Sequence, residues 1–288
     1  MPDISLIILT YNSQNYIGRL LKSLGAKYRH EIDNGKLEII VVDNNSSDKT
    51  LSVVKDFEEV RVVENGDNFG FAKGINLGSK KAKGRYLLFV NPDSEFLSGD
   101  VFSFVQKFKD EKVAVVGGKI LHTNGKKELS AGKFYNFWRV LLLSLGLEEN
   151  LRVRFSGEKD KFVDFVSGGF MMVRRDVWEK LGGFDEKFFM YLEDMEFCYR
   201  VKKHKLKVMF SPAATIQHVG QASSDRSFAI ANIYKGLLYF HKKHKGRFSY
   251  SFTKILLIVK ALLLVIVGKL SNNKYLDKAY SQALKASI

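Results

Sequence analysis

Short apolar runs alternate with amphipathic stretches in the first part of the chain. The runs are rich in β-branched residues and predict strands buried on both faces, at residues 4–9, 37–42, 60–63, 86–90 and 113–116. Apolar residues recur at helical spacing between the runs and predict helices at residues 17–24, 51–57, 72–83 and 101–108. Strands that alternate with helices favour an α/β fold with a parallel, doubly wound sheet, which binds ligands at the carboxyl ends of its strands.

The pattern is harder to read after residue 120. Residues 134–147 are apolar and aromatic, and fit either a helix or a mobile flap. Residues 163–173 resume a strand-like pattern, and residues 228–245 predict a helix with Tyr234 and Leu237 on its apolar face.

Polar clusters stand at the ends of three predicted strands. Thr10-Tyr11-Asn12 follows the first, and an Asp-rich segment at residues 43–48 follows the second. A carboxylate there can accept a hydrogen bond from the imide of a pyrimidine base, and an aromatic ring can stack on that base. The alternative is a turn followed by a helix N-cap. Asn91-Pro92-Asp93 follows another strand; its carboxylate can bind Mg²⁺ or Mn²⁺ with diphosphate oxygens, or the segment is an ordinary turn.

Glycines recur every fourth residue at Gly70, Gly74 and Gly78, which places them on one face of a helix. Two interpretations remain open, namely phosphate binding at the helix entry and close packing of the helix on the sheet. The Gly-Lys-Ser/Thr of a Walker loop is missing from the segment.

Acidic residues gather in an apolar, aromatic segment, at Asp185, Glu193, Asp194 and Glu196. Such surroundings raise the proton affinity of a carboxylate, which suits a general base. The alternative is a solvated face with Arg200 as ion-pair partner. Further along the chain lies the segment Gln217-His218-Val219-Gly220-Gln221-Ala222-Ser223, whose histidine is a structural residue unless its context makes it a metal ligand.

Composition narrows the function classes. One cysteine excludes an intrachain disulfide framework and a cysteine-rich zinc site. The net charge of +15 points to an anionic partner, and it is concentrated near the C-terminus. Residues 235–288 hold eleven Lys and Arg against one acid, Asp277. This asymmetry and the lack of a recognisable nucleic-acid-binding motif disfavour a nucleic-acid-binding protein.

A basic cluster at residues 241–247 precedes an apolar run at residues 255–268, so residues 241–270 are predicted to bind an anionic membrane surface. The alternatives are a helical hairpin packed on the body and a homodimer interface. The run is shorter than the roughly 20 residues that span a bilayer, so we expect no transmembrane helix. Residues 4–9 are too short for a signal-peptide core, and we expect a strand there.

Taken in order, these motifs resemble the family-2 inverting glycosyltransferases, and most of all their rhamnosyltransferase-type branch. The resemblance runs from about residue 4 to residue 223. It implies a GT-A fold, α/β with a central mostly parallel sheet, and a C-terminal helical tail. The implied boundaries are residues 1–225 for the catalytic domain, with a donor half at about 1–118 and an acceptor half at about 119–225, and residues 226–288 for the tail.

The resemblance also implies site roles. Asp194 would be the catalytic base, and Asp93 and His218 would hold a divalent metal, Mg²⁺ or Mn²⁺. The sugar pocket would be bordered by Gly168, Gly169 and Glu193. The implied donor-binding residues are Thr10, Tyr11, Asn12, Asp43, Asn68, Gly70, Asn76, Asn91 and Asp93.

The activity implied is inverting transfer of a sugar from a nucleotide-diphospho-sugar donor to a lipid-linked or polysaccharide acceptor in cell-surface glycan synthesis. Asn91 replaces the first Asp of the family's Asp-x-Asp motif, which in this branch favours dTDP-rhamnose. UDP-galactofuranose and UDP-N-acetylglucosamine remain alternative donors. Glu196 stands where the family more often has Asp. The expected location is cytoplasmic, peripheral on the inner face of the cell membrane.

Overall fold

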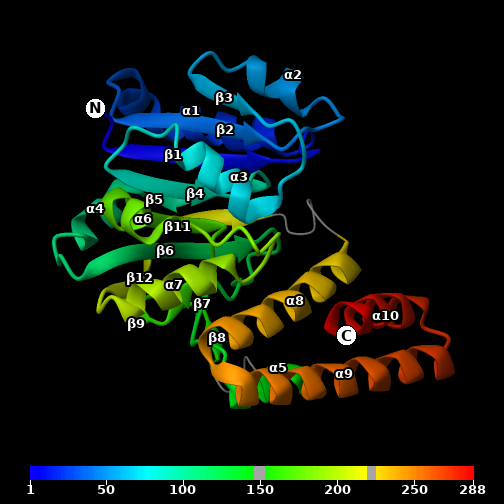
Figure 1. The fold of residues 1–288 in the computed structure, drawn as a ribbon. Coiled ribbons are helices and arrows are strands. Elements are labelled where there is room, and N and C mark those ends of the chain that lie inside the picture. Colours follow the sequence, from blue (N-terminus) through cyan, green and yellow to red (C-terminus); the bar gives the residue numbers. More distant parts are fainter. Residues whose placement is uncertain (146–152, 219–224) are drawn as a thin grey trace.

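The computed structural model describes residues 1–145, 153–218 and 225–288 (Figure 1). Within these residues the main sheet contains β1 (Ile4–Thr10), β2 (Leu37–Asp43), β3 (Val60–Glu64), β4 (Tyr86–Val90), β5 (Ser94–Gly99), β6 (Val113–His122), β9 (Lys161–Val163), β11 (Phe170–Arg174) and β12 (Lys207–His218). A small second sheet contains β7 (Ala131–Gly132), β8 (Arg154–Phe155) and β10 (Phe165–Val166).

The strand order of the main sheet is β3-β2-β1-β4-β11-β6-β12-β5, and β9 pairs with β12. β1 runs parallel to β2 and β4, and β2 runs parallel to β3. β11 is antiparallel to β4 and β6, and β5 is antiparallel to β12. The predicted α/β fold with a mostly parallel sheet is confirmed. The hydrophobic pattern alone had predicted a wholly parallel sheet, which is wrong at β11, β5 and β9.

Helices cover both faces of the sheet. Alternate residues of β1 enter different cores: Ile4, Leu6 and Ile8 belong to one, and Ile7 and Leu9 to the other. The first core includes side chains of α1 (Ile17–Asp33), α2 (Thr50–Lys55) and α4 (Phe102–Lys107), and the second those of α3 (Gly70–Ser79), α6 (Arg175–Leu181) and α7 (Glu193–Lys203). This arrangement confirms the doubly wound prediction.

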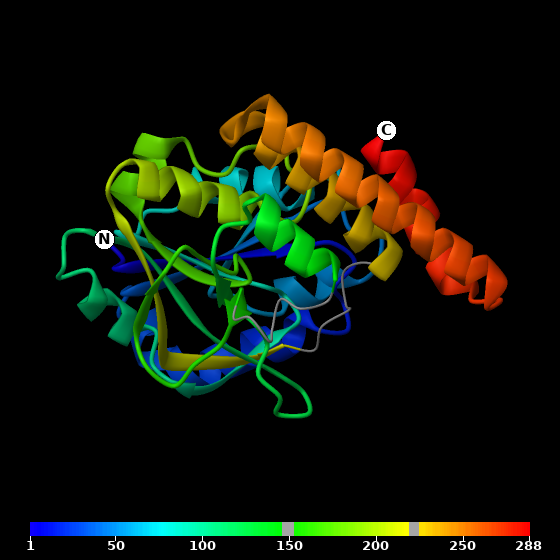
Figure 2. The same ribbon diagram turned by 90° about the horizontal axis from the view of Figure 1, so that it is seen from below.

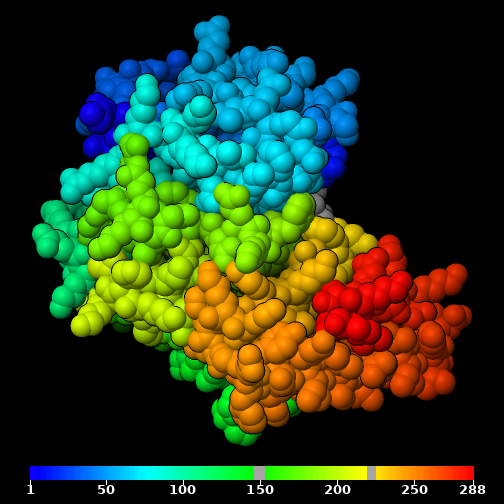
Figure 3. Space-filling model, in the orientation of Figure 1, coloured from blue at the N-terminus to red at the C-terminus, as the bar shows by residue number. Residues whose placement is uncertain are grey.

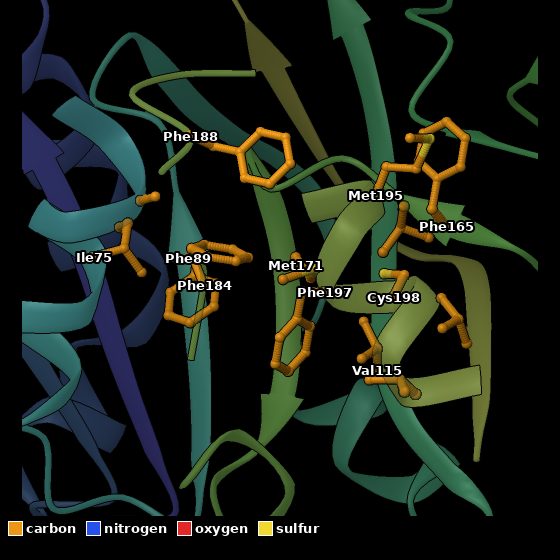
Figure 4. Close-up of a cluster of buried hydrophobic side chains, with 14 of the residues drawn as sticks. Ile75, Phe89, Val115, Phe165, Met171, Phe184, Phe188, Met195, Phe197 and Cys198 are labelled. Carbon is orange, nitrogen blue, oxygen red and sulfur yellow. The ribbon is translucent and has the colours of Figure 1, made fainter. Parts of the chain in front are cut away.

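The second core joins α7 to the sheet. Figure 4 shows Phe197 of α7 beside Met171 of β11, and Phe89 of β4 beside Phe184. Cys198 of α7 belongs to the same core. Trp178 packs on Phe89 with ring centroids 4.9 Å apart, so it is a packing residue. This packing fixes α7, and hence the acids at its beginning, relative to the strand ends.

Two of the three recurring glycines let α3 approach the sheet closely. A Cβ on Gly74 would lie 2.4 Å from the Leu9 side chain, and one on Gly78 would lie 2.5 Å from that of Val42. Contacts this short leave room only for hydrogen. At these two positions the structure therefore supports close helix–sheet packing.

The C-terminal region forms three helices, α8 (Arg226–His244), α9 (Gly246–Leu270) and α10 (Lys274–Ser287). Figure 3 shows α9 and α10, in orange and red, projecting beyond the body. α5 (Phe137–Ser144) packs beside α9, where Phe137 and Phe252 have ring centroids 5.1 Å apart (Figure 2). Of the two alternatives left open for residues 134–147, the structure has the helix, at Phe137–Ser144, and residues 146–147 lie outside the described residues.

The apolar segment of the tail is longer than its sequence pattern indicated. α9 has 25 residues and is, within the described chain, long and apolar enough by length and composition to cross a membrane. The expectation that this segment falls short of a spanning length is therefore wrong. Polar positions such as Ser249 and Thr253 hid the helix's length, because they interrupt the apolar run without interrupting the helix.

Candidate active site

A cavity of about 490 Å³ lies at the carboxyl ends of β1 and β4. Several elements wall it: the loop before β11, the beginning of α7, the end of β12, and α8. The predicted site residues that line it are Thr10, Tyr11, Asn91, Asp93, Gly168, Gly169, Glu193, Asp194 and His218. These residues come from positions up to 208 apart in the chain, so the fold brings together the predicted metal, base and sugar-pocket residues.

Asp93 and His218 meet because of strand pairing. β5 begins one residue after Asp93 and pairs with β12 so that Ser94 lies opposite His218. His218 Nε2 is consequently 3.0 Å from Asp93 Oδ1. The other ring nitrogen, Nδ1, lies 2.8 Å from Glu128 Oε2. Burial lowers the pKa of His218, but the hydrogen bonds and charges of Asp93 and Glu128 outweigh burial and raise that pKa to about 10.

The chemistry of this pair fits a divalent cation. An oxygen and a nitrogen that both lie about 2.1 Å from one octahedral ion are about 3 Å apart, close to the Asp93–His218 separation. No group of three or more His, Cys, Asp or Glu that could hold a metal is found among the described residues. Other ligands would therefore have to come from the donor diphosphate and water. The Asn91 amide instead packs against Gly169, where a Cβ would lie 2.8 Å from Asn91 Nδ2.

Asp194 is held at the beginning of α7 by two backbone donors. Its Oδ2 accepts from Gly168 N at 2.8 Å, and its Oδ1 accepts from Met195 N at 2.6 Å. Burial raises the pKa of Asp194, and these hydrogen bonds and the charge of Arg154 only partly oppose the rise. A raised pKa makes the ionised carboxylate a stronger base.

The neighbouring carboxyl, Glu193, is 4% exposed, and its Oε2 has no hydrogen-bond partner among the described residues. Burial, followed by the charge of Asp194, raises the pKa of Glu193 well above its usual range. Glu193 therefore holds a proton more readily and leaves the negative charge on Asp194.

A strained turn places these two acids. Tyr191 and Leu192 have φ of +71° and +72°, in the left-handed region that non-glycine residues rarely adopt. α8 packs on this turn at Gly236, where a Cβ would come 2.8 Å from the Leu192 side chain. Arg226, Ala229 and Ile233 of α8 also line the cavity. The first helix of the predicted tail is thus part of the site.

Several predicted donor-binding residues lie outside the cavity. Asp43 is 1% exposed and accepts hydrogen bonds from Thr10 and Ser46. Asn12 Oδ1 accepts from Ser47 N at 2.8 Å. These contacts hold the loops after β1 and β2 together, and direct contact of Asp43 or Asn12 with the donor stays a prediction.

The remaining three brace the loop before α7. Asn68 joins Gly70 to the Asn44 amide, and a Cβ on Gly70 would lie 2.3 Å from Phe189 O. Asn76 is doubly hydrogen-bonded to the Phe184 backbone, with both distances 2.9 Å. The donor contacts predicted for Asn68, Gly70 and Asn76 are likewise untested.

The pKa prediction for the acidic segment is wrong at Asp185 and Glu196. Burial alone would raise the pKa of each. The hydrogen bond from Lys243 is the main influence that lowers the pKa of Asp185, whereas the pKa of Glu196 is lowered by the hydrogen bond from His244, the charge of Arg200 and the hydrogen bond from Lys243. Glu196 is fully buried rather than solvated, and it also pairs with Arg200 and with His244. This cluster ties α8 to α7.

Two cavity residues, Glu128 and Arg154, were not singled out from the sequence. Both fall between residues 120 and 160, where no regular period marks a strand end. The Arg154 Nη2 donates to Leu129 O, and its Nε is buried with no partner among the described residues. Glu128 is a single acid that follows two lysines, and nothing in that local sequence indicates a functional site.

Comparison with known families settles the class of this site. Residues 5–182, more than half of the chain, match the family described as "Glycosyl transferase family 2". The chain belongs to this family. Residues 154–222 of this glycosyltransferase also match a family described as "N-terminal domain of galactosyltransferase".

The relatives of this glycosyltransferase include rhamnosyltransferases. It is 26% identical to the rhamnosyltransferase WbbL of Escherichia coli, over 77% of this chain and 85% of that protein. It is 23% identical to an N-acetylglucosaminyl-diphospho-decaprenol L-rhamnosyltransferase of Mycobacterium tuberculosis, over 85% and 87%. The chain is 27% identical to the hexosyltransferase Agl10 of Haloferax volcanii, and the match covers 64% of that protein's length.

The solved structure of the mannosyltransferase PcManGT from Pyrobaculum calidifontis, in complex with GDP-Man and Mn²⁺, shares the fold. Its TM-score is 0.60 at 17% identity, over 98% of this chain and 87% of that one. The GT-A fold that the motifs implied is therefore confirmed.

We expect Glu196→Gln to destabilise this glycosyltransferase by about 3 kcal/mol at neutral pH, because it removes the buried anion that the partly exposed Arg200 and Lys243 pair with. The folded pKa of Glu196 lies below the ordinary value of 4.5, so ionised Glu196 stabilises the fold above that pH. This contribution is lost as the pH falls through the folded pKa. Urea unfolding should show a difference between the two proteins that shrinks below pH 4.5. The exposed Asp56→Asn is the control, and a difference that stays constant with pH would contradict the prediction.

Proposed function

We propose that the protein transfers L-rhamnose from dTDP-rhamnose, with inversion, to a hydroxyl of a lipid-linked or polysaccharide acceptor in cell-surface glycan synthesis. The observation that carries the proposal is that Asp93, His218 and Asp194 line one cavity. A pair that suits a divalent cation and a base in the same space fit displacement of a diphosphate leaving group. Rhamnosyltransferases among the relatives favour this donor.

The displacement has two electrostatic requirements. Negative charge grows on the diphosphate as its bond to the sugar breaks, and a Mg²⁺ or Mn²⁺ ion bound by Asp93 and His218 would offset that charge. On the opposite face, Asp194 takes the proton of the acceptor hydroxyl while the hydroxyl oxygen bonds to the anomeric carbon. One displacement inverts the anomeric centre, and the leaving diphosphate keeps the electron pair of the broken bond.

The donor and acceptor would enter from different sides of the cavity. Tyr11, 41% exposed at the end of β1, offers a ring for the donor base. Gly168 and Gly169 leave space for the sugar beside Asp194. The lining also includes Leu143, Ala229 and Ile233, apolar side chains that suit an acceptor attached to a lipid.

We also propose that the protein is cytoplasmic and binds an anionic membrane surface through α9. One side of α9 is buried against its neighbours at Thr253, Leu257, Ala261 and Gly268. The outer side carries an exposed apolar stripe, defined as Phe248, Phe252, Ile255, Val259, Leu262, Leu263, Ile266, Val267 and Leu270. Exposed Arg247 and Lys269 stand near its two ends. Because one side of α9 packs on α8 and on the polar α10, lying in the interface suits it better than crossing the bilayer.

With a GlcNAc-diphospho-lipid acceptor, we expect the protein to release dTDP from dTDP-rhamnose in the presence of Mn²⁺. A panel that includes UDP-galactofuranose and UDP-N-acetylglucosamine tests the donor, with product formation followed by mass spectrometry. Turnover of a UDP-sugar and none of dTDP-rhamnose would overturn the rhamnose assignment while leaving the enzyme class intact.

Asp194→Asn should lower kcat by at least about 10³-fold, because an amide cannot accept the acceptor proton. Donor Kd, measured by calorimetry, should change by less than about threefold, since the base contacts the acceptor rather than the nucleotide. Asp56→Asn, an exposed change that does not line the cavity, is the matched control. Transfer at the wild-type rate in Asp194→Asn would exclude Asp194 as the base.

The double variant Leu263→Glu/Ile266→Glu should lose flotation with phosphatidylglycerol-containing vesicles, because two charges would enter the headgroup boundary. Gln282→Glu on the exposed side of α10 is the control, and both use the full-length chain. Sedimentation distinguishes the alternative: a wild-type dimer that the double variant converts to monomer, with no vesicle binding by either, would make the stripe a subunit interface.

A further inference from the structure

We propose that Glu128 is a positioning residue for His218: its carboxylate holds the imidazole so that Nε2 faces Asp93 and serves as the nitrogen ligand of the divalent cation. This inference rests on the proposed metal site. It adds a residue to that site which neither the hydrophobic pattern nor the motifs point to.

The two ring nitrogens of His218 have different partners. Nε2 is 3.0 Å from Asp93 Oδ1, and Nδ1 is 2.8 Å from Glu128 Oε2. An ionised carboxylate can only accept a hydrogen bond, so Glu128 keeps a proton on Nδ1. Without a cation beside it, Nε2 is protonated as well and donates to Asp93 Oδ1. A cation bound beside Asp93 would displace that proton, and the Nδ1–H tautomer held by Glu128 would then present the Nε2 lone pair to it.

Glu128 reaches His218 through a tight return of the chain after β6. Gly125, with φ of +75°, turns the chain, and Glu128 N donates to Ile120 O at 2.9 Å. β6 pairs with β12 so that His122 lies opposite His218. The turn therefore lays Glu128 over the end of β6, directly beside the last described residue of β12.

Glu128 is held in place independently of His218. Its backbone is anchored to β6, its side chain is 23% exposed, and the charges of His122 and Arg154 lie near its carboxylate. A preformed acceptor can orient the ring before a metal arrives, which is the arrangement found around histidine ligands in metal sites.

A purely structural ion pair and a positioning residue predict different results. Loss of a structural pair lowers the free energy of unfolding and leaves the choice of metal unchanged. Loss of ring orientation removes the nitrogen ligand, and an imidazole ligand favours Mn²⁺ over Mg²⁺, which prefers oxygen. The ratio of Mn²⁺ to Mg²⁺ affinity is therefore the decisive quantity.

The experiment measures the Kd for Mn²⁺ in the presence of dTDP, from the electron paramagnetic resonance signal of free Mn²⁺, with Mg²⁺ as competitor. Glu128→Leu keeps the side-chain volume and removes the acceptor, whereas Glu128→Gln keeps an acceptor oxygen. His218→Ala gives the reference for a lost ligand. Glu158→Ala is the matched control, since Glu158 is 59% exposed and pairs with Lys119 and Lys127.

We expect Glu128→Leu to weaken Mn²⁺ binding by about 10- to 100-fold and to lower the Mn²⁺/Mg²⁺ ratio towards that of His218→Ala. Glu128→Gln should restore most of the Mn²⁺ affinity and of the Mn²⁺/Mg²⁺ ratio. Glu158→Ala should have the wild-type value of each. Thermal unfolding monitors the fold of each variant. Wild-type Mn²⁺ affinity in Glu128→Leu, with His218→Ala impaired, would overturn the role of Glu128 alone. Wild-type affinity in His218→Ala would instead overturn the proposed metal site and this inference with it.

Discussion

The pairing of β12 with both β5 and β6 is the constraint on which the site depends. β12 is twelve residues long, and its last described residue, His218, lies opposite Ser94 on one side and His122 on the other. Asp93 precedes Ser94, and the turn after His122 returns Glu128 to the same place. A shift of one residue would turn His218 to the other face of the sheet, away from both carboxylates. Backbone hydrogen bonds thus set the position of the proposed cation site.

The position of the proposed base depends on a second junction, between α7 and α8. Asp194 follows a turn with two left-handed residues, and that conformation persists only because the surrounding packing holds it. Gly236 of α8 lies against the turn, and Lys243 and His244 reach the buried Glu196 one helical turn after Glu193. α8 therefore lines the site and supports α7, the helix that carries the proposed base. α9, which is apolar with basic residues near its ends, follows α8 directly in the chain. Contact of α9 with a membrane would therefore be transmitted to the site through α8.

The order of helices and strands was predictable because each has a recognisable hydrophobic pattern in its own segment of the sequence. The periodicity at Ile17, Leu20 and Leu21 marked a helix, and the run before Thr10 marked a strand. β5 was not predicted, because Ser94–Gly99 follows a turn, ends in polar residues and does not alternate regularly between apolar and polar positions. The direction of β11 was not predictable either, since hydrophobicity does not distinguish a parallel from an antiparallel neighbour. The length of α9 was missed because single polar residues interrupt an apolar run but not a helix.

By itself, the sequence determined the α/β class, the family, and the residue types at the strand ends. These features can be recognised from local hydrophobic patterns or from short motifs. It identified Asp93, Asp194 and His218 as candidates for one site. Tertiary structure decided which of the marked residues line the cavity and which, such as Asp43 and Asn76, brace the loops around it. Only the fold could show that Glu128 meets His218 and that Glu196 is neutralised by Lys243. The reason is physical: a pKa and a hydrogen bond depend on neighbours in space, and here those neighbours lie 47 to 90 residues apart in the chain.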